Sequence, residues 1–201
     1  KGYQVFGSGK TCRPNRPVNR DRTRSWTSYD DMGPVFRNES CNGGKVQMGS
    51  LARHNHAWDE IVGCEENDGE TLLTKAAVQH IAWATSGANA SRPFLVAMGH
   101  HRPHLPWNVP TRFYDLYGDP SAVPLAELQE YPATAPTISW HPWFDQEYLN
   151  DTDTQQHTRR VAYYAACSYF DYHLGMVLDA LHASGQEANT AVMMFGDHGW
   201  H

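Results

Sequence analysis

Hydrophobic residues along the chain form short continuous runs and longer periodic stretches, with polar segments between them. Continuous apolar runs at 94–98 and 190–195 are typical of strands buried on both faces of a parallel sheet. A shorter run at 3–6 predicts another strand, which leads into Gly7-Ser8-Gly9-Lys10. The pattern therefore predicts three strands that are far apart in the sequence.

Periodic apolar positions predict two helices. Alanine, valine and isoleucine recur at helical spacing over 74–85, and Gly87 is a natural stop. A longer helix is predicted over 154–183 and ends before Gly185. Its apolar stripe consists of Ala162, Ala166, Tyr169, Phe170, His173, Leu174, Val177, Leu178 and Leu181.

The remaining segments read as loops. Residues 11–60 and 118–152 are polar and show little periodicity, and two prolines forbid a helix over 99–106. Buried strands joined by helices predict an α/β fold with a mostly parallel central sheet flanked by helices. In such sheets ligands bind at the carboxyl edge, where polar residues follow the strands.

Composition narrows the class of protein. The 201 residues suit one domain, and 40% hydrophobic with 19% charged residues is typical of a globular chain. A net charge of −6 argues against nucleic acid as a partner, and no apolar run is long enough to span a membrane. The chain opens on an apparent strand and stops directly after a motif, so we expect an internal piece, 1–201, of a larger catalytic domain.

Cysteines and glycosylation sequons bear on the compartment. The cysteines are Cys12, Cys41, Cys64 and Cys167, and the sequons begin at Asn38, Asn89 and Asn150. The sequons favour a secretory route, in which a Cys41–Cys64 disulfide would fit. The alternative is four free thiols in a reducing compartment. Cys167 is predicted to be a buried thiol on the long helix.

Three groups of polar residues could carry chemistry. Asp197-His198-Gly199 follows the predicted strand at 190–195, and its carboxylate and imidazole could bind a hard cation such as Ca²⁺. An ordinary turn is the alternative. The second group, 100–104, reads His-His-Arg-Pro-His and suits an oxyanion, although a surface loop with one core histidine explains it as well.

Lys10 forms the third group, because a lysine held by a glycine turn can clamp a sulfate or phosphate. Taken alone, it is more often a surface lysine. The arginines between Arg13 and Arg24 are likewise more often a solvated face, or else they bind a polyanion.

Taken in order, these residues resemble the sulfatase family, and within it most closely the iduronate-2-sulfatase branch. The segments that carry the resemblance are Gly9-Lys10, 68–71, 92–106, 108–110, 142–143, 163–171 and 195–200. They extend over most of the chain, and their joint pattern is far more specific than any single segment.

The resemblance implies an alkaline-phosphatase-like α/β domain, present here in part. It implies one Ca²⁺ ion and a formylglycine nucleophile that matures from a C-x-P-S-R segment, which these 201 residues do not contain. It makes Asp197 and His198 metal ligands. It makes Lys10 and His104 catalytic and substrate-binding residues, with His104 as a candidate proton donor to the leaving alcohol.

One position departs from the family pattern. After Gly-Lys the family has roughly x-x-His-Pro, but this chain has Thr11-Cys12-Arg13-Pro14. Arg13 can bind an anion but cannot exchange a proton near neutral pH, so altered substrate or lost activity is an open alternative. Arg102 stands where this branch usually has lysine, which is a milder change.

The resemblance implies a lysosomal or secreted hydrolase of sulfate esters. The expected substrate is a sulfated glycan, as in glycosaminoglycan degradation, or a small sulfate ester. The piece alone should be inactive. Two alternatives remain open, namely a phosphodiesterase or phosphatase of the same superfamily and an inactive homologue that only binds anions. The residue at the nucleophile position would distinguish them.

Overall fold

The computed structural model describes residues 2–11, 22–30, 45–46, 58–63, 65–127, 133–136 and 151–199. The chain divides into two compact units. Unit 1 comprises residues 1–39, 66–101 and 171–201, and unit 2 comprises residues 40–65 and 102–170.

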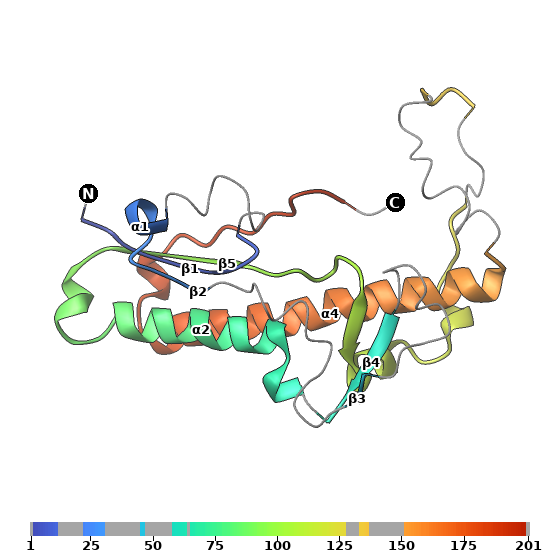
Figure 1. Cartoon of the computed structure of the whole chain (residues 1–201), viewed down its shortest axis with the longest axis horizontal. Coiled ribbons are helices and arrows are strands. Elements are labelled where there is room, and N and C mark those ends of the chain that lie inside the picture. The colour runs from blue at the N-terminus through green and yellow to red at the C-terminus, as the bar shows by residue number, and fades with distance from the viewer. Residues whose placement is uncertain are drawn as a thin grey trace. The chain divides into compact units, whose positions relative to one another are not determined.

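Unit 1 contains a parallel sheet in the order β2-β1-β5 (Figure 1). β1 (Gln4–Gly9) lies between β2 (Ser28–Asp30), which follows the short helix α1 (Arg22–Ser25), and β5 (Phe94–Gly99). β1 and β5 run in register from their first residues to Gly9 opposite Gly99. Both strands therefore end at the same level, and Lys10 and His100 leave the sheet at its carboxyl edge. The predicted parallel pairing is confirmed.

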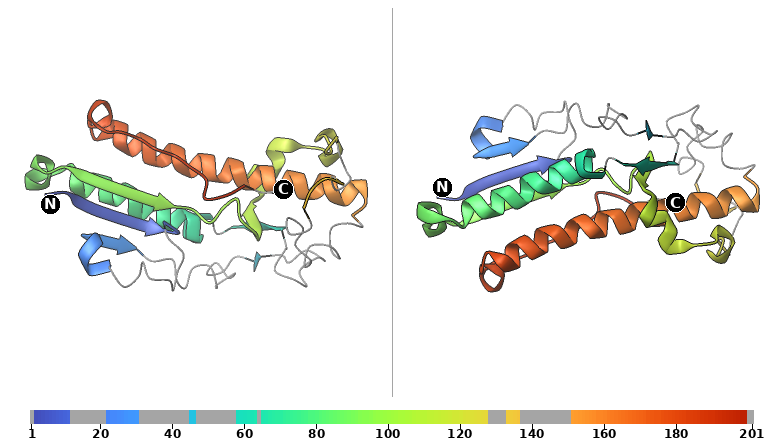
Figure 2. Two further views of the ribbon diagram at one scale, coloured as in Figure 1. Left: turned by 90° about the horizontal axis from the view of Figure 1, so that it is seen from above. Right: turned by 90° about the horizontal axis from the view of Figure 1, so that it is seen from below.

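Helix α2 (Gly69–Ala84) packs against β1 and β5, as both views of Figure 2 show. It begins at Gly69 rather than at the predicted Thr74, because the Asp68 side chain caps it by accepting a hydrogen bond from the Glu70 N–H at 3.2 Å. The 3-10 helix η3 (Glu65–Asn67) precedes the cap, and η4 (Gly87–Ser91) follows the helix.

Helix α4 (Asp153–Ala183) confirms the predicted long helix almost to the residue. Its first part belongs to unit 2, and residues from Asp171 onward belong to unit 1. Of the predicted stripe, Ala162, Ala166, Tyr169, His173 and Leu181 are buried, whereas Leu178 is 40% exposed. Gly185, with φ of 71°, lies just beyond the end of the helix, and η8 (Glu187–Asn189) follows.

Unit 2 holds a second sheet in the order β3-β4-β6. β3 (Lys45–Val46) pairs antiparallel with β4 (Trp58–Val62), and β4 pairs parallel with β6 (Trp107–Pro110). The short helices α3 (Thr111–Tyr114), η5 (Asp115–Tyr117) and η6 (Pro120–Ala122) follow. These elements are not predictable from the sequence pattern, because strands and helices of two to five residues are too short to show a period.

The predicted buried strand at 190–195 is wrong for this structure. Residues 190–196 follow no strand or helix pattern, and Met193 and Phe195 are 86% and 85% exposed. The apolar run has the composition of a buried strand, but none of the described strands pairs with it. β5 is also less buried than predicted, with Leu95 48% exposed.

No helix among the described residues is both long enough and apolar enough to cross a membrane.

Candidate functional site

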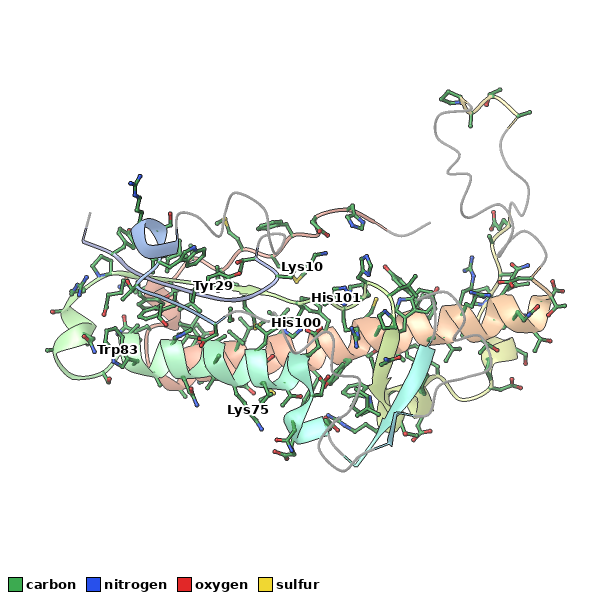
Figure 3. All side chains as sticks on the ribbon, viewed as in Figure 1. Lys10, Tyr29, Lys75, Trp83, His100 and His101 are labelled. Carbon is green, nitrogen blue, oxygen red and sulfur yellow. The ribbon has the colours of Figure 1, made fainter. Side chains whose placement is uncertain are left out.

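Lys10 lies immediately after β1, at the carboxyl edge of the sheet in unit 1 (Figure 3). Its backbone N–H donates to the Gly99 carbonyl oxygen at 2.6 Å, which joins the ends of β1 and β5. Its ammonium nitrogen lies 3.4 Å from Oδ2 of Asp197, and its side chain is 23% exposed. Two of the predicted site residues, 187 positions apart, are therefore in contact.

The glycines at this edge allow the close approach of the two strands. Gly9 has φ of 70°, which side-chain-bearing residues rarely adopt, and a Cβ there would overlap the Gly99 carbonyl. A Cβ on Gly99 would overlap the backbone of Lys10 and Thr11. Lys10 can hold its place only because neither position carries a side chain.

Tyr29 on β2 also fixes the turn that holds Lys10. Its hydroxyl donates to the Gly9 carbonyl oxygen at 2.6 Å and lies 2.5 Å from the Thr11 hydroxyl. The polar pattern of residues 11–60 predicts a loop at Tyr29 and gives no sign of this role. Its aromatic character, three residues after Trp26, was the available signal for a packed segment.

Asp197 and His198 lie side by side in unit 1, after the extended segment rather than at the end of a strand. The His198 Nδ1–H donates to the Gly199 carbonyl at 2.9 Å, and Nε2 lies 3.8 Å from Asp197 Oδ1. Desolvation tends to raise the pKa of Asp197, but the charges of Lys10 and His198 outweigh it, so the pKa lies below its ordinary value.

A carboxylate oxygen and an imidazole nitrogen facing each other are compatible with part of a metal site. They do not make a complete one, since Ca²⁺ takes six to eight oxygen ligands. Within the described parts of the chain, no group of three or more His, Cys, Asp or Glu side chains could hold a metal ion. The metal assignment of Asp197 and His198 remains a prediction.

His100 is a buried core residue, and its charged partner is a carboxylate of the protein rather than a bound oxyanion. Its side chain is 1% exposed and contacts the carboxylate of Glu70 through Nδ1. The His100 ring also stacks on His173 of α4, with centroids 5.1 Å apart. Of the two interpretations of the 100–104 cluster, the one with a core histidine is therefore confirmed at this position.

Arg102 and His104 of the same cluster belong to unit 2. Arg102 donates from Nε and Nη2 to the Asn108 carbonyl oxygen at 3.1 and 3.0 Å, so its guanidinium stabilises the loop. His104 is exposed, and its Nδ1 lies 2.7 Å from the Leu105 carbonyl oxygen. A carbonyl oxygen can only accept, so Nδ1 carries the proton of this hydrogen bond. Whether His104 converges with Lys10 and Asp197 remains a prediction.

Several predicted features lie outside the described residues. They are Arg13, most of the arginine-rich segment that it opens, and the Cys41–Cys64 pair. Cys167 is described and is a free thiol on α4, as predicted, but it is half-buried rather than buried. Burial raises its pKa, against a hydrogen bond with Tyr163 that lowers it. Its thiol is therefore poorly reactive near neutral pH.

The sulfatase family model matches residues 17–201. The chain belongs to the sulfatase family. This sulfatase chain is 26% identical to the iduronate 2-sulfatases of Mus musculus and Homo sapiens and 29% identical to a sulfatase of Formosa agariphila. Each alignment includes 99% of the chain. The chain spans 38% of the length of the two iduronate 2-sulfatases.

Solved structures confirm the fold. The phosphonate monoester hydrolase of Silicibacter pomeroyi superposes with a TM-score of 0.57 over 92% of this chain and 43% of its own, at 17% sequence identity. The corresponding enzyme of Agrobacterium radiobacter gives a TM-score of 0.53. The sulfatase chain therefore has the alkaline-phosphatase-like α/β fold, with a parallel sheet and flanking helices, and represents part of that domain.

Proposed function

We propose that the protein of which this sulfatase chain is part hydrolyses a sulfate ester of a glycosaminoglycan, in the manner of an iduronate 2-sulfatase. The observation that carries the proposal is the contact between Lys10 and Asp197 at 3.4 Å. An ammonium group and a carboxylate meet in this contact at the carboxyl edge of a parallel sheet, where α/β folds bind ligands.

Each residue has a distinct role in the proposal. The Lys10 ammonium donates to a sulfate oxygen and offsets the charge that grows on it during cleavage. Asp197 and His198 are ligands of one Ca²⁺ ion, together with groups from parts of the protein that this chain does not contain. That ion would supply positive charge to the sulfate oxygens. Arg13 adds an anion contact, and His104 donates a proton from Nε2 to the leaving alcohol.

Two further features belong to the same proposal. The nucleophile is a formylglycine supplied by a part of the protein that this chain does not contain. The protein is a lysosomal or secreted glycoprotein, with glycans on its sequons and a Cys41–Cys64 disulfide. The sequons and the similarity to iduronate 2-sulfatases over 99% of the chain support this compartment.

The test uses the full-length protein and a fluorogenic aryl sulfate. Replacing Lys10 with alanine should lower kcat/KM about 100- to 1,000-fold, because a charged donor to the reacting oxyanion is lost. Lys75→Ala is the matched control, since Lys75 is an exposed lysine paired with Glu66 at 3.2 Å. It should change kcat/KM by less than about twofold, as exposed pairs contribute little.

Other substrates distinguish the alternatives. Turnover of an aryl phosphate or phosphonate with no turnover of the sulfate would contradict the proposal in favour of phosphoryl chemistry. Tight binding of sulfated glycan without any turnover would favour an inactive anion-binding homologue. Release of sulfate from iduronate-2-sulfate units, compared with sulfated glucosamine units, would decide the finer specificity.

A further inference from the structure

A buried carboxylate lies behind the candidate site. Glu70, in the first turn of α2, is 2% exposed, although it carries a charge that burial makes costly. It lies on the same face of α2 as the buried residues Leu73, Ala77 and Ile81. A charged side chain at such a position requires compensating partners, and these partners show which segments Glu70 holds in place.

Both carboxylate oxygens of Glu70 bind the residues that follow β5. Oε2 contacts Nδ1 of His100, and Oε1 accepts the backbone N–H of His101 at 3.2 Å. One side chain therefore holds two successive residues, one by its ring and the other by its backbone. Figure 3 shows His100 and His101 following one another beyond β5.

The far side of the His100 ring is also fixed. The Thr74 hydroxyl donates its only proton to the Glu70 carbonyl at 2.8 Å, so it accepts from His100 Nε2–H at 3.3 Å. His173 stacks on the ring and binds the Thr71 hydroxyl at 3.2 Å. The imidazole is thereby held on both edges and on one face.

Glu70 holds the Gly99–His101 junction, the segment where β5 ends, and this junction also positions Lys10. The carbonyl of Gly99, the residue before His100, accepts the backbone N–H of Lys10 at 2.6 Å. A displacement of the junction would therefore move the Lys10 backbone.

We propose that Glu70 is a positioning residue, which fixes the Gly99–His101 junction and through it Lys10. This inference rests on the proposed sulfate ester hydrolysis and adds a residue that does not touch the substrate. Glu70→Ala removes both contacts. Glu70→Gln keeps them, because its carbonyl oxygen still accepts from His101 and its amide can donate to His100 Nδ1.

The first measurement is amide hydrogen exchange in the full-length protein. Glu70→Ala should speed exchange at His101 about 10- to 100-fold, as expected when a hydrogen bond to a charged acceptor is lost. Exchange in the middle of α4 should stay unchanged, which separates local release from general destabilisation. Glu66→Ala, which removes an 87% exposed carboxylate in η3 that pairs with Lys75, is the control and should leave His101 unaffected.

The second measurement is steady-state hydrolysis of an aryl sulfate. Glu70→Ala should lower kcat/KM about 10- to 100-fold for the folded fraction, and Glu70→Gln should recover most of that loss. Unchanged exchange and activity in Glu70→Ala would overturn the proposal. Equal acceleration of exchange throughout the protein, with no recovery by glutamine, would also overturn it. If the wild type hydrolyses no sulfate ester, the proposed function fails, while exchange at His101 still decides whether Glu70 holds the junction.

Discussion

Two histidines of unit 1 have environments that shift their pKa values in opposite directions. Desolvation lowers the pKa of His80 below 6.5, and the nearby Asp30 carboxylate, 3.0 Å away, only partly opposes this. The fully exposed His182 has its pKa raised above 6.5 by a hydrogen bond to Glu187, at 2.6 Å, and by its charge. Burial therefore determines the direction of the pKa shift of His80, and the pairing with Glu187 determines that of His182.

We therefore expect an NMR titration to place the midpoint of His80 below that of His182. Asp30→Asn should lower the His80 midpoint further, because it removes the charge that favours the protonated ring. Glu187→Gln should bring His182 back towards 6.5. A His80 midpoint above that of His182 would contradict the burial of the His80 ring.

The sign of the effect on stability follows from the His80 shift. The unfolded chain takes up a proton at His80 near pH 6.5, but the folded chain resists it. The unfolding free energy should therefore fall as pH drops below 6.5, until the folded state is protonated as well, and should not depend on His80 above that range. His182 acts in the opposite sense, and its stabilisation is lost as pH rises through its raised pKa.

At the scale of secondary structure, the junction of β1 and β5 depends on Gly99. Gly99→Ala should lower the unfolding free energy by about 1–3 kcal/mol, because the new Cβ overlaps the backbone of Lys10 and Thr11. Gly175→Ala on α4 is the matched control, since nothing lies within 4 Å of its added Cβ. It should stabilise the protein by about 0.5–1 kcal/mol. Urea unfolding of both variants measures the difference, and equal effects would contradict the tight junction.

The elements also show what the sequence could predict. α4 and the β1–β5 pair were predictable because a long apolar stripe and continuous apolar runs each suit one structure. The first turn of α2 is not predictable from the pattern, because Glu70 interrupts the apolar positions and its buried partner, His100, lies beyond β5 in the sequence. The prediction of a strand at 190–195 is wrong for a different reason. The composition of this segment favours a strand, but a strand forms only where a neighbouring strand pairs with it.

The candidate site was predictable to a similar degree. Lys10 lies at the carboxyl edge of the sheet as the strand pattern predicts, but its contact with Asp197 does not follow from that pattern, because the described structure has no strand at 190–195. The burial of His100 could not be predicted, because nothing in residues 100–104 distinguishes a histidine that contacts a carboxylate from one that is exposed to solvent. Tyr29 and Glu70 bind the backbone of segments that are distant in the sequence, and such contacts produce no recognisable spacing of residues.

At the scale of the molecule, we expect the isolated 201-residue chain to release no sulfate from an aryl sulfate. It contains no C-x-P-S-R segment, and among its described residues no group of three or more His, Cys, Asp or Glu side chains could hold a metal ion. Purified chain and full-length protein should be assayed in parallel with Ca²⁺ present. Turnover by the isolated chain that disappears in Asp197→Ala would refute this expectation and the assignment of the nucleophile.

The contact between Lys10 and Asp197 has a consequence for how the protein folds during its synthesis. The two residues are 187 positions apart, so the ribosome adds the second roughly 10–40 s after the first, at about 5–20 residues per second. During that interval Lys10 has no anionic partner at position 197. Closing so long a loop is slow compared with forming a helix such as α4. The anion site should therefore be among the last features to mature, after the surrounding helices have already formed on the emerging chain.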